Sequence, residues 1–169
     1  IALDLLSDHA GAVTAVRDEL RALAGRSDTD PIRIDALITL GVMQLANAAP
    51  SDALATLVEV ETLFEREGAD LKERGALDFK IADVLAALDR VPESEARARR
   101  ALDRFDEAGV DADDDVRAHA SLLYAEALSR QERWREAIAP YRRAVAIWTL
   151  NGNYPQRLAW AQWGLAVAV

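Results

Sequence analysis

The stretch YAEALSRQERWREAIAPYRRA, residues 124–144, is the part of this chain that decides its fold. Two small residues in it, Ala125 and Ala137, lie 12 positions apart on either side of a polar break. Small residues where two helices cross let the backbones approach, and large neighbours fill the space beside the crossing. The large neighbours in this stretch are Tyr124, Leu128, Trp134 and Tyr141. We therefore expect two helices that pack antiparallel to each other across a short connection.

The same arrangement recurs along the chain every 41–43 residues. The small residues Gly41, Ala82 and Ala125 are followed, 12 positions later, by Ala53, Ser94 and Ala137. An aromatic residue also stands four positions before a glycine three times, in the pairs Phe64 and Gly68, Phe105 and Gly109, and Trp148 and Gly152. Two kinds of residue that keep one period indicate an internal repeat.

Each period contains two helical stretches separated by a short break. In the first complete period Asp30 predicts the start of one helix, and Ser51 is expected to cap the next. Gly68 suits the left-handed turn that ends this second helix. In the third period Asp113 is the expected cap of the first helix.

These signals predict a single repeat-built domain over residues 1–169. Its units are complete repeats at 30–69, 70–111 and 112–153, with partial repeats at 1–29 and 154–169. In the first partial repeat we expect residues 1–6 to form the tail of one helix and residues 10–24 to form its partner. Because the sequence begins at Ile1 and ends within an apolar helical pattern, we expect a piece of a longer chain.

The composition restricts the classes of function. Of 169 residues, 51% are hydrophobic and 29% are charged, and the net charge of −9 would repel nucleic acid and anionic membranes. The lack of cysteine excludes disulfides and thiolate chemistry, and His9 and His119 are the only histidines. No phosphate-binding loop, metal-ligand spacing or nucleophile motif is present, so we expect no enzyme, no cofactor and no metal. We also expect no membrane segment, and a bacterial, cytoplasmic protein.

Three polar clusters have structural interpretations. His119 and Glu126 lie two turns apart on one expected helix, and they fit a solvent-facing polar pair better than an acid–base pair. The run of aspartates at 111–115 lacks the glycine and the closing glutamate of a calcium loop, so helix capping explains it. The arginines within residues 97–100 alternate with acidic residues and predict a salt-bridged, solvent-exposed helix face.

Paired helices with small residues 12 positions apart resemble the tetratricopeptide repeat, most closely in the third unit. The longer period is similar to that of the repeats of kinesin light chains and of many bacterial regulatory proteins, which also close on a glycine. The resemblance implies an all-α fold, a right-handed α-solenoid of antiparallel helix hairpins. Gln44, Asp78 and Ser121 depart from the family pattern, because large apolar residues usually occupy their positions. No unit has the closing proline of the family.

The resemblance also implies a concave groove, formed by the first helix of each unit, that binds a peptide or helix of a partner protein. The groove positions of the family correspond here to Asp35, Ile38, Val42, Phe79, Asp83, His119, Leu122, Glu126 and Arg130. Their apolar members predict a strip for an amphipathic or extended segment, although Ile38, Val42 and Phe79 also fit packing against neighbouring helices. Lys72 and Lys80 are not on the expected face, which argues against a clamp for a C-terminal carboxylate.

These observations lead to three hypotheses about function. The leading one is a non-catalytic scaffold that binds protein partners as the regulatory or recruitment part of a larger protein. The second is self-association, for example as a homodimer, through the apolar last helix that carries Trp160 and Trp163. Both tryptophans also fit core positions, and an end this apolar needs a further helix, another domain or a second copy to cover it. The third is a ligand-sensing arm of a signalling or transcription protein.

Overall fold

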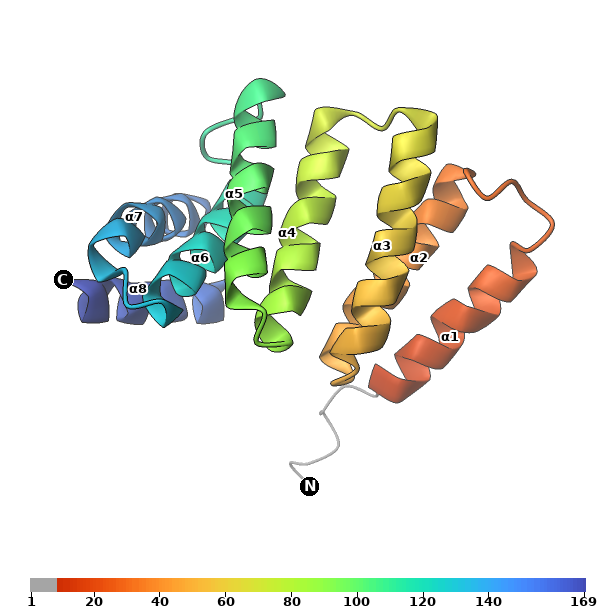
Figure 1. The fold of residues 1–169 in the computed structure, drawn as a ribbon, viewed down its shortest axis with the longest axis horizontal. Helices are drawn as coiled ribbons and strands as arrows, with labels where there is room; N and C mark the ends of the chain where they lie inside the picture. The colour runs from red at the N-terminus through yellow and green to blue at the C-terminus, as the bar shows by residue number, and fades with distance from the viewer. Residues whose placement is uncertain (1–8) are drawn as a thin grey trace. The chain divides into compact units, whose positions relative to one another are not determined.

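The computed structural model describes residues 9–169, and its regular structure is helical throughout that range (Figure 1). The helices are α1 (His9–Ala22), α2 (Pro31–Ala46), α3 (Pro50–Glu67), α4 (Leu71–Ala87), α5 (Val91–Glu107), α6 (Asp115–Arg130), α7 (Trp134–Asn151) and α8 (Pro155–Ala168). The prediction of an all-α fold is confirmed. The helix tail expected at residues 1–6 lies outside the described residues.

The described residues divide into two compact units, one that ends at Gly68 and one that begins at Ala69. In the first unit, α2 packs against both α1 and α3. In the second unit each helix from α4 to α8 packs against the next one. The helix α6 also packs against α4 and against α8, so that these three alternate helices lie side by side. The division between the units falls one residue before the expected boundary between the first two complete repeats.

Two predicted helix ends are confirmed in the first unit. The Asp30 side chain accepts a hydrogen bond of 2.9 Å from the backbone N–H of Ile32, which is the N-cap interaction at the start of α2. Gly68 follows α3 with a φ of 77°, a left-handed conformation that glycine adopts without strain. Both ends therefore follow from the chemistry of single residues.

Two other expected caps are wrong, Ser51 by two positions and Asp113 by one. The helix α3 begins at Pro50, so that Ser51 lies inside its first turn and makes no cap. Proline suits this place because its φ is already helical and its missing N–H is not needed there. At the start of α6, Asp114 accepts a hydrogen bond of 3.0 Å from the Val116 N–H, and Asp113 lies one residue outside the helix cap.

The small residues 12 positions apart bring the helices of each hairpin into close contact. Gly41 of α2 and Ala53 of α3 are both buried, and a Cβ atom added to Gly41 would lie only 2.7 Å from Leu57 Cδ2. In the next hairpin the hydroxyl of Ser94 donates a hydrogen bond of 2.8 Å to the backbone carbonyl of Ala82. These residues therefore set how closely the paired helices approach.

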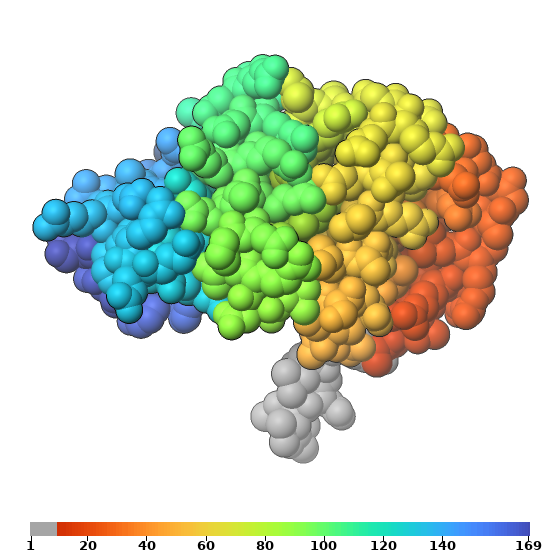
Figure 2. All heavy atoms as spheres, in the orientation of Figure 1, coloured from red at the N-terminus to blue at the C-terminus, as the bar shows by residue number. Residues whose placement is uncertain are grey.

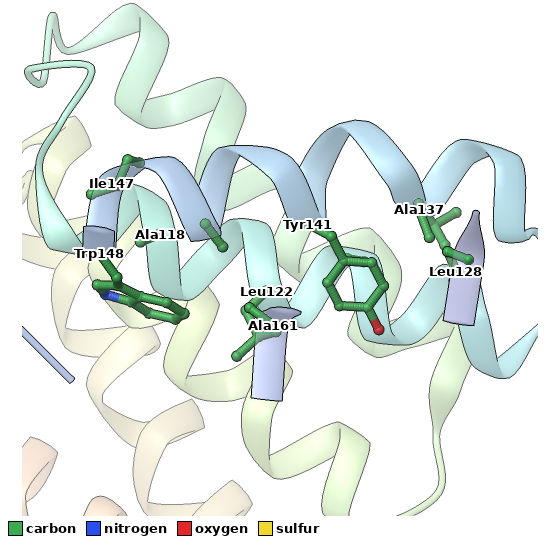
Figure 3. Close-up of a cluster of buried hydrophobic side chains, with 11 residues drawn as sticks. Ala118, Leu122, Leu128, Ala137, Tyr141, Ile147, Trp148 and Ala161 are labelled. Atoms are coloured by element: carbon green, nitrogen blue, oxygen red, sulfur yellow. The ribbon is translucent and has the colours of Figure 1, made fainter. Parts of the chain in front are cut away.

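The helices α6, α7 and α8 share one hydrophobic core (Figure 3). It contains Ala125 and Ala137, the small pair of the third repeat, and both are fully buried. Figure 3 shows Trp148 and Tyr141 on the same side of α7, with Ala161 of α8 between them. Because α8 packs on that side of α7, the three helices enclose one continuous core.

One buried carboxylate connects α4 with α5. Asp78 is 1% exposed, and it accepts hydrogen bonds from Arg97 at 2.9 Å, from Arg100 at 2.5 and 2.9 Å, and from Arg104 at 2.5 Å. Arg97 and Arg100 form ion pairs, as predicted for a salt-bridged face, but they pair with the buried Asp78 of α4 and compensate its charge. In Figure 2, which has the orientation of Figure 1, the atoms of α4 and α5 are in close contact.

Candidate interaction face of the second unit

The alternate helices α4, α6 and α8 bring charged and aromatic side chains together. Five of the predicted groove residues take part, namely Phe79, Asp83, His119, Glu126 and Arg130. Ring contacts, hydrogen bonds and electrostatic interactions connect these five with Lys80, Arg157 and Trp160. We call these eight side chains the α4–α6–α8 face.

His119 is enclosed by aromatic rings. It stacks on Phe79 with the ring centroids 5.9 Å apart, and it meets the rings of Trp148 at 5.1 Å and Tyr154 at 4.8 Å edge-on. Burial, followed by the charge of Arg157, lowers the pKa of His119 to about 4. The imidazole is therefore neutral at neutral pH, and its role on this face is aromatic packing.

Lys80 and Asp83 add opposite charges that are partly removed from water. The ammonium group of Lys80 lies 4.3 Å from the centre of the Phe79 ring, within the range of a cation–π interaction. Burial lowers the pKa of Lys80 and raises the pKa of Asp83, although Arg157 and Lys80 favour the charged form of Asp83. The expectation that Lys80 lies off the groove face is wrong, because its charge acts on both Asp83 and His119.

Glu126 is a second carboxylate of this face, and its negative charge is only partly balanced by its neighbours. Burial is the main cause that raises the pKa of Glu126, and the negative charge of Asp83 adds to it. The indole N–H of Trp160 opposes this effect by donating a hydrogen bond to Glu126 Oε1. The expected solvent-facing pair with His119 is wrong, because Glu126 is bonded to α8 while His119 packs among rings.

Arg130 connects the end of α6 to the end of α4. Its guanidinium group donates hydrogen bonds to the Ala86 carbonyl at 2.9 Å and to Asp89 Oδ1 at 2.5 Å. Arg130 also lowers the pKa of Glu126, but it is the weakest of the influences on that group. The charge of Arg130 is therefore shared with α4, and it leaves Glu126 only partly compensated.

A cavity of about 380 Å³ lies next to Glu126 and is lined by the end of α6, by α7 and by α8. Its walls include the aromatic residues Trp134, Tyr141, Trp160 and Trp163, and the charged residues Glu126 and Arg130. Pockets that bind small molecules or side chains are usually concave and mostly apolar, with a few polar groups that fix orientation. The cavity has this composition.

The two tryptophans of α8 are surface residues. Trp160 is 53% exposed and Trp163 is 59% exposed, and their ring centroids are 5.1 Å apart. The prediction that they fit core positions is wrong, because α8 turns Ala161 and Ala168 toward the core instead. The exposed side of α8 continues with Val167, which is 51% exposed. The α4–α6–α8 face therefore extends into an apolar surface on α8.

Leu122 is not available to a partner. It is 3% exposed and belongs to the core together with Tyr141, Trp148 and Ala161 (Figure 3). The expectation that Leu122 provides an apolar anchor in a groove is therefore wrong, because side chains of α7 and α8 enclose it.

The other predicted groove residues belong to the first unit. Asp35 and Val42 are exposed on α2, and Ile38 is half-buried there. They are not among the side chains of the α4–α6–α8 face. Their part in binding stays a prediction for the first unit alone.

Lys80, Arg157 and Tyr154 were missing from the predicted groove residues. Arg157 lies three residues before Trp160, about one helical turn, so the register of α8 could have indicated it. Tyr154 precedes α8 in a left-handed conformation with a φ of 54°, and no feature of the repeat period marks this position.

Within residues 9–169, no group of three or more histidine, cysteine, aspartate and glutamate side chains is placed to hold a metal ion. The aspartates at 111–115 instead support helix structure: Asp114 caps α6, and Asp115 accepts hydrogen bonds of 3.0 Å from Asn151 and Asn153. In the same part of the chain, no helix combines the length and the apolar character needed to cross a bilayer.

Comparison with known proteins agrees with this architecture. The family model of the tetratricopeptide repeat matches residues 73–150. No curated protein matches the chain significantly. The crystal structure of the TPR-like repeats of a putative kinesin light chain from Podosopora anserina has a TM-score of 0.74 and 20% identity, covering 95% of this chain and 77% of that one. A point variant of those repeats has a TM-score of 0.75 and 20% identity, with 95% and 76% covered.

Tetratricopeptide repeats generally mediate protein–protein interaction. The matched segment contains all of α5 and α6 and most of α4 and α7. It therefore includes the side chains that α4 and α6 contribute to the α4–α6–α8 face. The resemblance predicted from the sequence is therefore confirmed: residues 73–150 match the tetratricopeptide-repeat family model, and nearly the whole chain shares the fold of TPR-like repeats.

Proposed function

We propose that the chain is a non-catalytic interaction scaffold whose α4–α6–α8 face binds a segment of another polypeptide. The observation that carries this proposal is the set of partly desolvated charges on that face. Burial shifts the pKa values of Lys80, Asp83 and Glu126 against their charged forms. A partner that supplies opposite charge and hydrogen bonds would stabilise these groups, and such complementarity also provides specificity.

The aromatic side chains supply the apolar part of such a contact. Phe79, His119 and Tyr154 form one ring cluster, and Trp160 and Trp163 form another. Aromatic residues often dominate the binding energy of protein interfaces. We expect the partner segment, helical or extended, to carry apolar anchors and at least one charged residue. In this proposal the chain is the regulatory or recruitment part of a larger cytoplasmic protein.

A random-peptide display screen against the chain tests the proposal. The affinity of a selected peptide is then measured by fluorescence polarisation for the wild type, for Asp83→Lys and for the control Asp103→Lys. Asp103 is exposed on α5, which contributes nothing to the α4–α6–α8 face. We expect Asp83→Lys to weaken binding at least about tenfold and Asp103→Lys to leave it unchanged.

The screen has two outcomes that contradict the proposal: no peptide is selected, or all three proteins bind the peptide equally. Circular dichroism spectra show whether the variants remain folded. If Asp83→Lys loses its helical signal, Phe79→Ala replaces it, since this change removes a half-buried ring of the face without adding charge.

Self-association is a second candidate function, because Trp160, Trp163 and Val167 expose apolar surface on α8. Light scattering at several protein concentrations tests it. A mass that approaches that of a homodimer in the wild type, and stays monomeric in Trp163→Glu, would support self-association. A constant monomer mass in both proteins would contradict it.

A further inference from the structure

The cavity beside Glu126 has mainly aromatic walls. Trp134 and Tyr141 come from α7, and Trp160 and Trp163 come from α8. The rings of Trp160 and Trp163 are 5.1 Å apart and tilted by 31° to each other. The faces of aromatic rings carry partial negative charge, and tryptophan attracts cations more strongly than tyrosine or phenylalanine does.

Close packing of α8 on α7 positions these rings. Gly164 lies against the ring of Tyr141, and a Cβ atom at this position would be only 2.5 Å from Tyr141 Cζ. Trp160, Gly164 and Val167 lie on one side of α8 because they are spaced by four and three residues. The glycine therefore lets α8 approach α7, with the tryptophan and valine bordering the space that remains.

One wall of the cavity contributes a negative charge. Among residues 9–169, the carboxylate of Glu126 accepts one hydrogen bond, from the Trp160 indole N–H, although a carboxylate has about four acceptor positions. Arg130 also lines the cavity, but its guanidinium group donates to Asp89 and to the Ala86 carbonyl. Asp83 and Arg157 act on Glu126 with opposite signs. Burial of Glu126 favours its protonated form, so a cation placed beside it would restore its charge.

We propose that this cavity receives a cationic side chain, a lysine or an arginine, from the bound polypeptide. The inference rests on the proposed function, because the partner supplies the cation. A purely apolar side chain would remove Glu126 further from water without compensating its charge. An anionic side chain would be repelled by Glu126 and by the ring faces. A cation is attracted both by the faces of the aromatic rings and by the carboxylate of Glu126.

Simple cations test this inference without a partner. Three of the four tryptophans of the chain line the cavity, so tryptophan fluorescence reports on its occupancy. The probes are n-butylammonium chloride, which has the end of a lysine side chain, and n-butanol, which has similar size but no charge. Both are titrated at constant ionic strength into the wild type, Glu126→Gln, Trp163→Ala and the control Glu132→Gln. Glu132 is exposed and lies outside the cavity wall.

We expect saturable binding of n-butylammonium by the wild type and by Glu132→Gln, and binding of n-butanol that is at least about tenfold weaker. Glu126→Gln should weaken the binding of the cation about fivefold or more, and Trp163→Ala should abolish it. Trp163 is exposed, so its loss should leave the helical circular dichroism signal unchanged.

The inference is overturned if n-butanol binds as well as n-butylammonium, if the wild type shows no saturable response, or if Glu126→Gln binds the cation like the wild type. A homodimer that fills the cavity, seen by light scattering and lost in Trp163→Ala, would also overturn it. Peptides that bind the α4–α6–α8 face while n-butylammonium does not bind would leave the proposed function standing and reject only the cation site.

Discussion

Asp78 of α4 and Glu126 of α6 are carboxylates on neighbouring helices in very different surroundings. Asp78 is 1% exposed and accepts hydrogen bonds from three arginines of α5. Within the described part of the chain, Glu126 accepts one hydrogen bond, from Trp160, and it borders a cavity. A fully paired buried charge maintains the hairpin, whereas a partly compensated charge next to a cavity can gain from a ligand. The interior of the α4–α5 hairpin therefore has a structural role, whereas the α4–α6–α8 face is suited to binding.

The largest effect should come from Asp78→Asn. This change removes the negative charge and leaves the guanidinium groups of Arg97, Arg100 and Arg104 without their common partner. Breaking a buried ion pair on one side destabilises a protein by several kcal/mol, so we expect a loss of about 3 kcal/mol in the free energy of unfolding. Urea denaturation followed by circular dichroism measures it. A loss below about 1 kcal/mol would show that the arginines do not depend on Asp78.

A smaller loss is expected for Gly164→Ala in the wall of the cavity. The added Cβ atom would meet the buried ring of Tyr141 at 2.5 Å, and overpacking of this kind destabilises by about 1–3 kcal/mol. The better helix propensity of alanine returns up to about 1 kcal/mol, so the net loss should be about 1–2 kcal/mol. Gly25→Ala is the control, because nothing lies within 4 Å of a Cβ atom there. Equal stability of the two variants would contradict the close approach of α8 to α7.

The lowered pKa of His119 predicts that the contribution of the α4–α6–α8 face to stability depends on pH. Its folded pKa of about 4 lies below its ordinary value of 6.5, so the unfolded chain binds more protons between these values. The contribution of His119 to stability is therefore complete above pH 6.5 and is lost as the pH falls toward 4. In His119→Phe, the drop in unfolding free energy from pH 7 to about pH 4.5 should be smaller than in the wild type.

Urea denaturation at both pH values measures this drop in the two proteins. Asp83 and Glu126 have raised pKa values and act in the opposite direction, but they do so in both proteins. The difference between the wild type and His119→Phe therefore isolates the imidazole. An identical drop in both would mean that His119 titrates as it does in the unfolded chain.

The smallest effect on stability should come from Glu126→Gln. The amide oxygen can still accept the hydrogen bond of Trp160, and the partly uncompensated charge is removed, so we expect a change within about 0.5 kcal/mol. Thermal unfolding of Glu126→Gln and of Asp78→Asn, measured in parallel, compares the contributions of the two carboxylates to stability. If the two variants lose the same stability, Glu126 is a structural charge like Asp78, and the distinction fails.

Much of the fold could be predicted from the sequence because it depends on single residues at a fixed period. Gly41 must be small where α2 meets Leu57 of α3, and Gly68 must permit a left-handed turn. Such requirements for a small residue or a glycine can be recognised from a single sequence. The three arginines around Asp78 could not be predicted in this way, because their contact depends on how α4 and α5 rotate against each other and on long side chains that reach across the hairpin.

The candidate face was predictable only in part. Phe79, Asp83 and Glu126 follow from the register of the first helix in each repeat. Leu122 has the same register, but the packing of α7 and α8 buries it, and no local pattern indicates this. Trp160 was expected in the core for a related reason: the sequence shows that α8 is apolar, but not which of its sides faces α7.

The central claim, that the α4–α6–α8 face binds a polypeptide, is tested most directly by amide hydrogen exchange with and without a peptide selected on the chain. We predict slower exchange in α4, α6 and α8 of the complex, with little change in α3. Because amides of a covered face open less often, protection maps the contact. Protection confined to α5, to α7 or to the first unit would contradict the claim.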